Sequence, residues 1–143
     1  MSDCTIISSA ISCANYEMRF NKPLISGIIF PQVNKRPVVS ASGKYYIKLY
    51  FNGIPRRVTI DHRVLVKPNR NPACTYSSNR GELWPILIEK AFLKAHGGYG
   101  YDGGNGGQDT YILTGWIPEN IIFSDDMEVS MDEIWRKIHG AFK

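Results

Sequence analysis

The sequence predicts an α+β fold in which helices pack against a small antiparallel sheet. Three patterns carry this prediction. Apolar residues near the start recur at helical spacing, residues 44–51 alternate between apolar and polar, and residues 83–96 form a second apolar helical stripe. The 143 residues suffice for one domain with a substantial buried core.

The first helix is expected from about Asp3 onward. Its inner face is apolar at a spacing of three to four residues, over Ile6, Ile7, Ala10, Ile11 and Ala14. Asp3 stands at the position of an N-cap, where a carboxylate accepts backbone N–H groups of the first turn. Cys13 lies near the inner face, and we interpret it as a small buried hydrophobe.

A β-hairpin is expected in the middle of the chain, after a short apolar run at 24–30 that Pro31 ends. Its first strand alternates Tyr45, Ile47, Leu49 and Phe51 with Lys44, Tyr46, Lys48 and Tyr50. Asn52-Gly53 is typical of a tight turn with two positive-φ residues. We expect the return strand at Arg57–Asp61 and a third strand near Val64–Val66.

Two further helices are expected in the second half. One runs from about Leu83 to His96, with Pro85 tolerated in its first turn and Gly97 ending it. The last runs from about Ser130 to Phe142, and Ser130 with Glu133 fits a capping box. Residues 67–80, before the first of these helices, are polar and turn-rich, and residues 97–107, between the two, hold seven glycines.

Composition narrows the class of protein. The net charge is only +4 and the basic residues are scattered, so we expect no nucleic-acid partner, and a small RNA-binding domain is a remote alternative. There is no apolar run of membrane-spanning length and no signal-peptide pattern, which favours a cytoplasmic protein. The cysteines Cys4, Cys13 and Cys74 lack zinc-site spacing, so no metal site is expected.

Cys4 has two interpretations. At the first turn of a helix, a thiol meets unpaired N–H groups and the positive end of the helix dipole, which favour the nucleophilic thiolate. Otherwise Cys4 is a small residue at the start of a core helix. His62, His96 and His139 could each be proposed as its base, but none lies in a recognisable motif and each is more typical of a surface or capping position.

The glycine-rich stretch also has alternatives. A phosphate cradle is disfavoured, because the stretch follows a helix and lacks the P-loop pattern. Gly103-Gly104, between polar Asp102 and Asn105, suits a wall along which an extended peptide lies close to the backbone. A plain flexible loop is the other interpretation.

Four stretches, in the right order from about Ser2 to Glu119, together resemble the Cys-bearing lobe of the calpain-type, papain-like cysteine peptidase domain. They are SDCTIISSAI, GKYYIKLYFNGIPRRVTIDHRVLV, ELWPILIEKAFLKAHGGY and DGGNGGQDTYILTGW. The details YSSNRGELWP and TGWIPE resemble the atypical, PalB-like branch of that family.

The resemblance implies that Cys4 is the nucleophile and that Gly103 and Gly104 hydrogen-bond a peptide substrate. In the family a His and an Asn on a second lobe complete the catalytic set. Their motifs are not found in this sequence, and neither is the oxyanion-hole Gln upstream of the Cys. Thr5 replaces the aromatic residue that commonly follows the Cys, and His62 replaces an Asp.

Calcium is the metal that the resemblance implies for conventional members. Its ligands there lie upstream of the Cys and at an acid before the Trp-bearing helix, where this chain has Asn79. We therefore expect no cofactor and no calcium dependence.

The sequence is thus interpreted as part of an intracellular endopeptidase. Residues 1–122 would form the Cys-bearing lobe, and 123–143 a linker and the first helix leading to a second lobe, the expected partner within the same protein. The expected substrates are proteins or peptides, and the resemblance adds an endosome-associated assembly. The alternative function is a non-catalytic, peptide-binding scaffold of the same fold.

Overall fold

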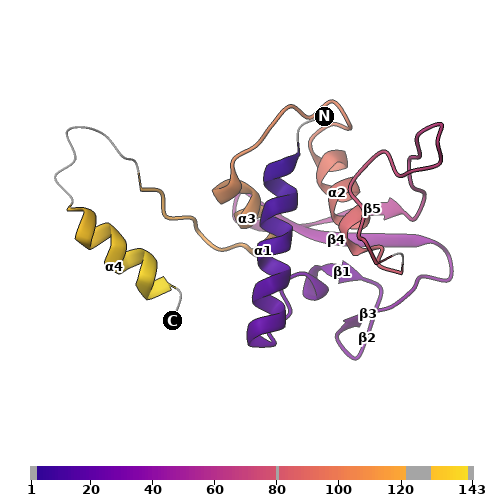
Figure 1. The fold of residues 1–143 in the computed structure, drawn as a ribbon. Helices are drawn as coiled ribbons and strands as arrows, with labels where there is room; N and C mark the ends of the chain where they lie inside the picture. Colours follow the sequence, from indigo (N-terminus) through magenta and orange to yellow (C-terminus); the bar gives the residue numbers. More distant parts are fainter. Residues whose placement is uncertain (1–2, 80, 122–129, 142–143) are drawn as a thin grey trace.

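The computed structural model describes residues 3–79, 81–121 and 130–141 (Figure 1). Its helices are α1 (Cys4–Phe20), α2 (Trp84–Ala95), α3 (Gly106–Thr114) and α4 (Met131–Ala141), with a short 3-10 helix, η1 (Ser26–Ile28). Its strands are β1 (Ile29–Phe30), β2 (Gln32–Val33), β3 (Arg36–Pro37), β4 (Lys44–Phe51) and β5 (Ile54–Asp61). The predicted α+β class is confirmed.

The central sheet is antiparallel, in the order β1-β4-β5. The hairpin β4–β5 is the one expected from the alternating pattern, and its return strand begins at Ile54, three residues earlier than expected. Asn52 and Gly53 form the turn with φ of 51° and 78°, as the Asn-Gly pair predicts. Tyr45, Ile47 and Leu49 are buried, so the alternation correctly predicts which face of β4 meets the core.

The prediction of a third strand at 64–66 is wrong. The third strand of the sheet is β1, which pairs Ile29 with Ile47, and Val66 makes only an isolated bridge to Pro72. The chain leaves the sheet after Asp61, where the Lys90 ammonium of α2 binds the carbonyl oxygens of Asp61 and Arg63. The small hairpin β2–β3 was also not foreseen.

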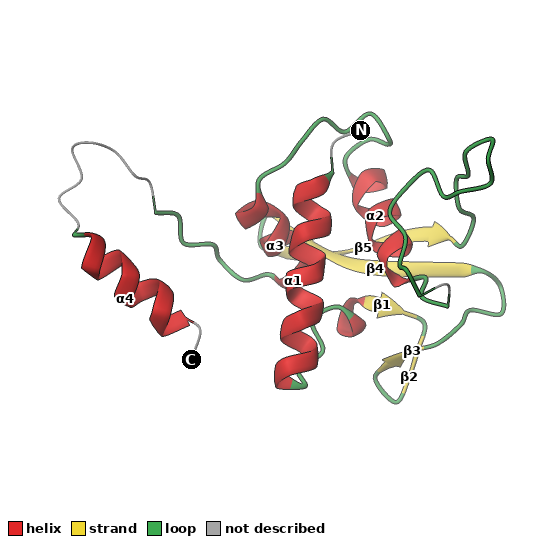
Figure 2. Ribbon diagram, in the orientation of Figure 1, coloured by secondary structure: helices red, strands yellow, loops and turns green. Residues whose placement is uncertain are grey.

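The core lies where α1 and α2 pack side by side over the sheet, as Figure 2 shows. Its fully buried apolar side chains come from four elements, α1, β4, α2 and α3, and include Ile6, Ile47, Ile88, Phe92 and Leu113. Cys13, at 4% exposure, belongs to this core, as interpreted from the sequence. None of the helices in the described part of the chain is long and apolar enough to cross a membrane.

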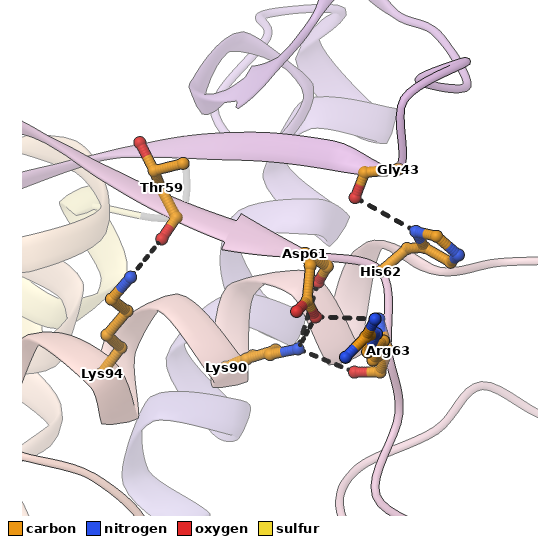
Figure 3. Close-up of polar contacts among 7 residues, drawn as sticks. All are labelled: Gly43, Thr59, Asp61, His62, Arg63, Lys90 and Lys94. Carbon is orange, nitrogen blue, oxygen red and sulfur yellow. Dashed lines mark hydrogen bonds and ion pairs between the residues drawn. The ribbon is translucent and has the colours of Figure 1, made fainter.

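Two lysines of α2 attach that helix to β5 (Figure 3). Lys94 donates to the carbonyl oxygen of Thr59 at 2.7 Å. Lys90 forms an ion pair with Asp61, and this hydrogen bond holds the pKa of the Asp61 carboxyl below its ordinary value. Beside this contact, His62 Nδ1 lies 3.1 Å from the carbonyl oxygen of Gly43, which precedes β4 at the same open end of the hairpin.

Helix α3 was missed by the sequence analysis, which assigned its first residues to the glycine-rich loop. Asn105 caps it, because its side chain accepts the N–H groups of Gly107 and Gln108. Ser9 of α1 donates to the carbonyl oxygen of Gly106 at 3.2 Å. The helix is therefore docked directly on α1.

Helix α4 follows the expected bounds to within a residue. The Ser130 hydroxyl accepts the N–H of Glu133 at 3.3 Å, which is half of the predicted capping box. Lys137 pairs with Glu119 at 2.9 Å, which links α4 to the segment after α3. The predicted boundary at residues 122 and 123 lies outside the described residues.

We expect the middle of the hairpin and its turn end to tolerate truncation differently. Ile47→Ala removes a fully buried side chain and should lower the free energy of unfolding by about 2–5 kcal/mol. Ile54→Ala, at a residue 59% exposed, should cost less than about 1 kcal/mol. Urea denaturation of both variants measures the difference, and equal losses would contradict the burial assigned to these two residues.

Candidate active site

Cys4 is the first residue of α1, and its side chain is exposed. Asp3 contributes the carbonyl oxygen that accepts the N–H of Ile7 at 3.2 Å and so starts the helix. A shallow groove of about 610 Å³ lies along this end of α1, lined by Asp3, Cys4, Ile7, Ser8, Ile11, Ser12 and Thr75. The thiol therefore stands at a helix N-terminus and in an accessible groove, where backbone N–H groups of the first turn favour a negative charge.

Asp3 occupies the N-cap position but does not act as predicted. Its side chain makes no capping hydrogen bond. The carboxyl contacts Glu89 of α2 instead, and Oδ2 of Asp3 is buried. The capping prediction fails because α2 offers this side chain a contact that the local sequence does not reveal.

Glu89 is only 1% exposed and lies beneath the groove. Its Oε2 accepts the N–H of Thr75 at 2.8 Å, and Thr75 is itself a groove residue. Burial, and then the contact with Asp3, raise the pKa of Glu89 to about 7. This carboxyl therefore joins two walls of the groove that contains Cys4.

Asp109 of α3 is the second buried carboxyl near this helix end, also 1% exposed. Burial raises its pKa, and contact with the Thr5 hydroxyl and the charge of His96 offset part of that effect. The Oδ2 of Asp109 and the Oγ1 of Thr5 both face Gly104. The residue after Cys4 is thus held against the glycine-rich segment.

The two predicted substrate-binding glycines differ in their surroundings. Gly103 has a φ of +92° and open space where a side chain would be. A methyl group at Gly104 would lie 2.8 Å from Thr5 Oγ1 and 2.9 Å from Asp109 Oδ2, and closer still to the Tyr101 hydroxyl. The structure therefore brings Gly104 against the first turn of α1, next to Cys4.

The histidines do not line the Cys4 groove, although the charge of His96 acts on Asp109. No histidine lines the groove at Cys4 among the residues that the structure describes. His62 contacts the carbonyl of Gly43, and His96 contacts the carbonyl of Phe92 while its ring packs against Tyr101. His139 lies in α4 beside Trp135.

Asn79, at the position where the resemblance expects a calcium-binding acid, donates to the neighbouring Glu82. The Glu82 carboxylate is bound by the Ser77 hydroxyl at 2.7 Å and by the Asn79 amide at 3.2 Å, so local donors occupy both of its oxygens. Within residues 3–79, 81–121 and 130–141, no three His, Cys, Asp or Glu side chains gather as metal ligands. A second cavity, of about 490 Å³, lies at the far end of α1 near Met18 and contains none of the predicted site residues.

Sequence analysis missed Glu89 and Asp109, although both left a signal. The residues three and four positions from Glu89 are Pro85, Ile86, Phe92 and Leu93, all apolar. A carboxylate on such a face is either buried with a partner or disruptive. Asp109 was not predicted as a site residue, because the glycines before it have low helix propensity and indicated a loop.

Comparison with known proteins gives a consistent result. A family model described as calpain family cysteine protease matches residues 1–143. The chain is 46% identical to Calpain-7 of Homo sapiens over 99% of its own length and 18% of that protein. It is 36% identical to the calpain-like protease palB of Emericella nidulans, over 99% of the chain and 17% of the relative. The chain thus spans less than a fifth of these relatives, and no solved structure matches it.

We expect Gly104 and Gly103 to respond differently to alanine. Gly104→Ala forces the Tyr101 hydroxyl to move, so Tyr101→Phe should recover part of its loss, with a coupling energy of about 1 kcal/mol. Gly103→Ala, strained only by its positive φ, should lose about 1–2 kcal/mol and show no coupling to Tyr101→Phe. Denaturation of the single and double variants measures both couplings, and equal couplings would show that the packing behind Gly104 is misassigned.

Proposed function

The chain belongs to the calpain family of cysteine proteases, and we propose that it is the lobe that carries the nucleophile of a papain-like endopeptidase. The sequence resemblance to this family is thereby confirmed. One observation carries the proposed role of Cys4. The exposed thiol stands at the N-terminus of α1, while Gly104 packs against the adjacent residue, Thr5.

The proposed chemistry is acyl transfer. A histidine of the second lobe takes the Cys4 thiol proton, the thiolate sulfur attacks the carbonyl carbon of a peptide bond and forms a C–S bond, and the carbonyl oxygen becomes an oxyanion. The backbone N–H of Cys4 donates to that oxyanion. Collapse of the intermediate breaks the C–N bond, and the same histidine of the second lobe protonates the leaving amine. Water then hydrolyses the thioester.

Substrate binding is proposed at Gly103 and Gly104. An extended peptide presents backbone N–H and C=O groups along its edge, and a glycine wall lets it come close enough to hydrogen-bond. The exposure of both residues supports this role. Gly104 would contact both the peptide and Thr5, and would so position the peptide relative to Cys4.

The finer features of the whole protein are also proposals. They are endoproteolysis of protein substrates, a cytoplasmic site of action, and an endosome-associated assembly. The family supports the first directly, because its members are proteases. The other two rest on the likeness to Calpain-7 and palB alone. We propose no calcium requirement, since the residues at the expected position bind one another.

Selective labelling tests the role of Cys4. With iodoacetamide at pH 6, Cys4 should be alkylated at least ten times faster than Cys13 and Cys74, as read by mass spectrometry of the peptides. Cys13 is buried, which raises its pKa, and burial followed by the charge of Glu89 raises the pKa of Cys74. Equal, slow labelling of all three would favour the non-catalytic, peptide-binding scaffold.

Activity is expected to need the second lobe. The 143-residue chain by itself should cleave no peptide above background, because no histidine lines the groove at Cys4 within the described residues. A fluorogenic peptide library measures this. Turnover that is present in the chain and lost in Cys4→Ala would show that the base is supplied from within these residues.

A further inference from the structure

Two charged side chains are buried in the described part of the chain, and both contact a neighbour of Cys4. Glu89 contacts Asp3, the residue before the thiol. Asp109 contacts Thr5, the residue after it. Since burying a carboxyl is costly without a partner, the placement of both beside one exposed thiol calls for an explanation.

The Asp3–Glu89 contact joins two acidic groups. Oε2 of Glu89 is satisfied by the Thr75 N–H, whereas Oε1 of Glu89 and Oδ2 of Asp3 are buried and receive no donor from the described residues. Two ionised carboxylates in contact repel one another, and in a buried site that repulsion is strong. A single proton between the two oxygens satisfies both and removes one of the two charges.

We propose that Asp3 and Glu89 share one proton, and that Glu89 is a positioning residue that acts on Cys4 through Asp3. The pair holds Asp3, the residue before α1, in place. With one proton shared, the two carboxyls carry a single negative charge beside the thiol. This inference rests on the proposed role of Cys4 as nucleophile. Glu89 reaches both Asp3 and Thr75, so it ties together two sides of the Cys4 groove.

Other ionisable groups face Glu89 from the surrounding elements. Lys90 is its neighbour on α2, but its ammonium is held at the end of β5. Burial raises the pKa of Cys74 and of Tyr99, and the charge of nearby Glu89 adds to both increases. Arg63 lines the same small cavity as Glu89. Asp3 remains the group in contact with the carboxyl oxygen that has no donor.

The sign of the effect on Cys4 follows from charge. Because the pKa of Glu89 is raised to about 7, the shared proton is retained below neutral pH and lost above it. Loss of that proton adds a second negative charge close to the thiol and disfavours the thiolate. At an effective dielectric constant of about 20–40, a charge one residue away shifts a titration by about half to one pH unit.

Glu89→Gln tests this role without removing the contacts. The Gln carbonyl still accepts the Thr75 N–H, and its NH₂ group donates to Asp3, so the variant imitates protonated Glu89 at every pH. The rate of Cys4 alkylation by iodoacetamide, followed from pH 5 to 9 by mass spectrometry, should have its midpoint lowered by about half to one pH unit. Asp3→Asn should shift the midpoint in the same direction.

Glu82→Gln is the matched control. Glu82 precedes α2 and lines the cavity at the far end of α1, so the same chemical change there should leave the Cys4 profile unchanged. A Glu89→Gln profile identical to that of the unmodified chain overturns the positioning role. A role in folding alone would change the stability of the chain and leave the midpoint where it was.

An independent measurement follows the proton directly. The NMR signal of the Glu89 side-chain carboxyl carbon should show a titration midpoint near pH 7. In Asp3→Asn that midpoint should move to lower pH. This measurement decides the question even if Glu89→Gln fails to fold. Titration of Glu89 near its ordinary value overturns the shared proton. If Cys4 is alkylated no faster than Cys74, the proposed function of Cys4 as nucleophile is contradicted. The titration of the Glu89 carboxyl is a separate measurement, so it tests the shared proton whatever the alkylation result.

Discussion

The site depends on how a single helix is packed. One face of α1 must bury Ile6, Ala10 and Cys13 against the sheet and α2, while its first turn must leave Cys4 exposed. Because the side chains of a helix repeat every 3.6 residues, fixing the buried face fixes the direction of the thiol. Helix α2 supplies the core contacts and also holds Asp3, and α3 holds Thr5, so the position of the nucleophile follows from the packing of the core.

Patterns of local origin could be predicted well from the sequence. The alternation in β4, the Asn-Gly turn and the buried stripe of α2 each reflect contacts between residues close along the chain. The strand expected at 64–66 is absent, and the third strand is β1, which is distant in sequence from the hairpin turn and pairs with β4. Helix α3 was missed because its glycines have low helix propensity, and it is stabilised by the Asn105 cap and by docking on Ser9.

The candidate site could be predicted only in part, for a similar reason. Cys4 and the glycine pair are visible as motifs, and the structure brings Gly104 to the residue beside Cys4. Glu89 and Asp109 could not be predicted in this way, because a carboxylate in a helix is normally expected to face solvent. Its burial becomes evident only when its partner on another element is known. In the stretch Ile88–Lys94, Glu89 turns to the site while Lys90 and Lys94 attach α2 to β5.

The open groove at Cys4 has a thermodynamic consequence. Asp3 lies at its surface and Glu89 just beneath it, so any lobe or peptide that covers the groove removes water from both carboxyls. A drier environment strengthens their repulsion and their affinity for the shared proton. Binding at this groove and proton uptake are then linked, and by reciprocity a fall in pH through neutrality tightens whatever binds there.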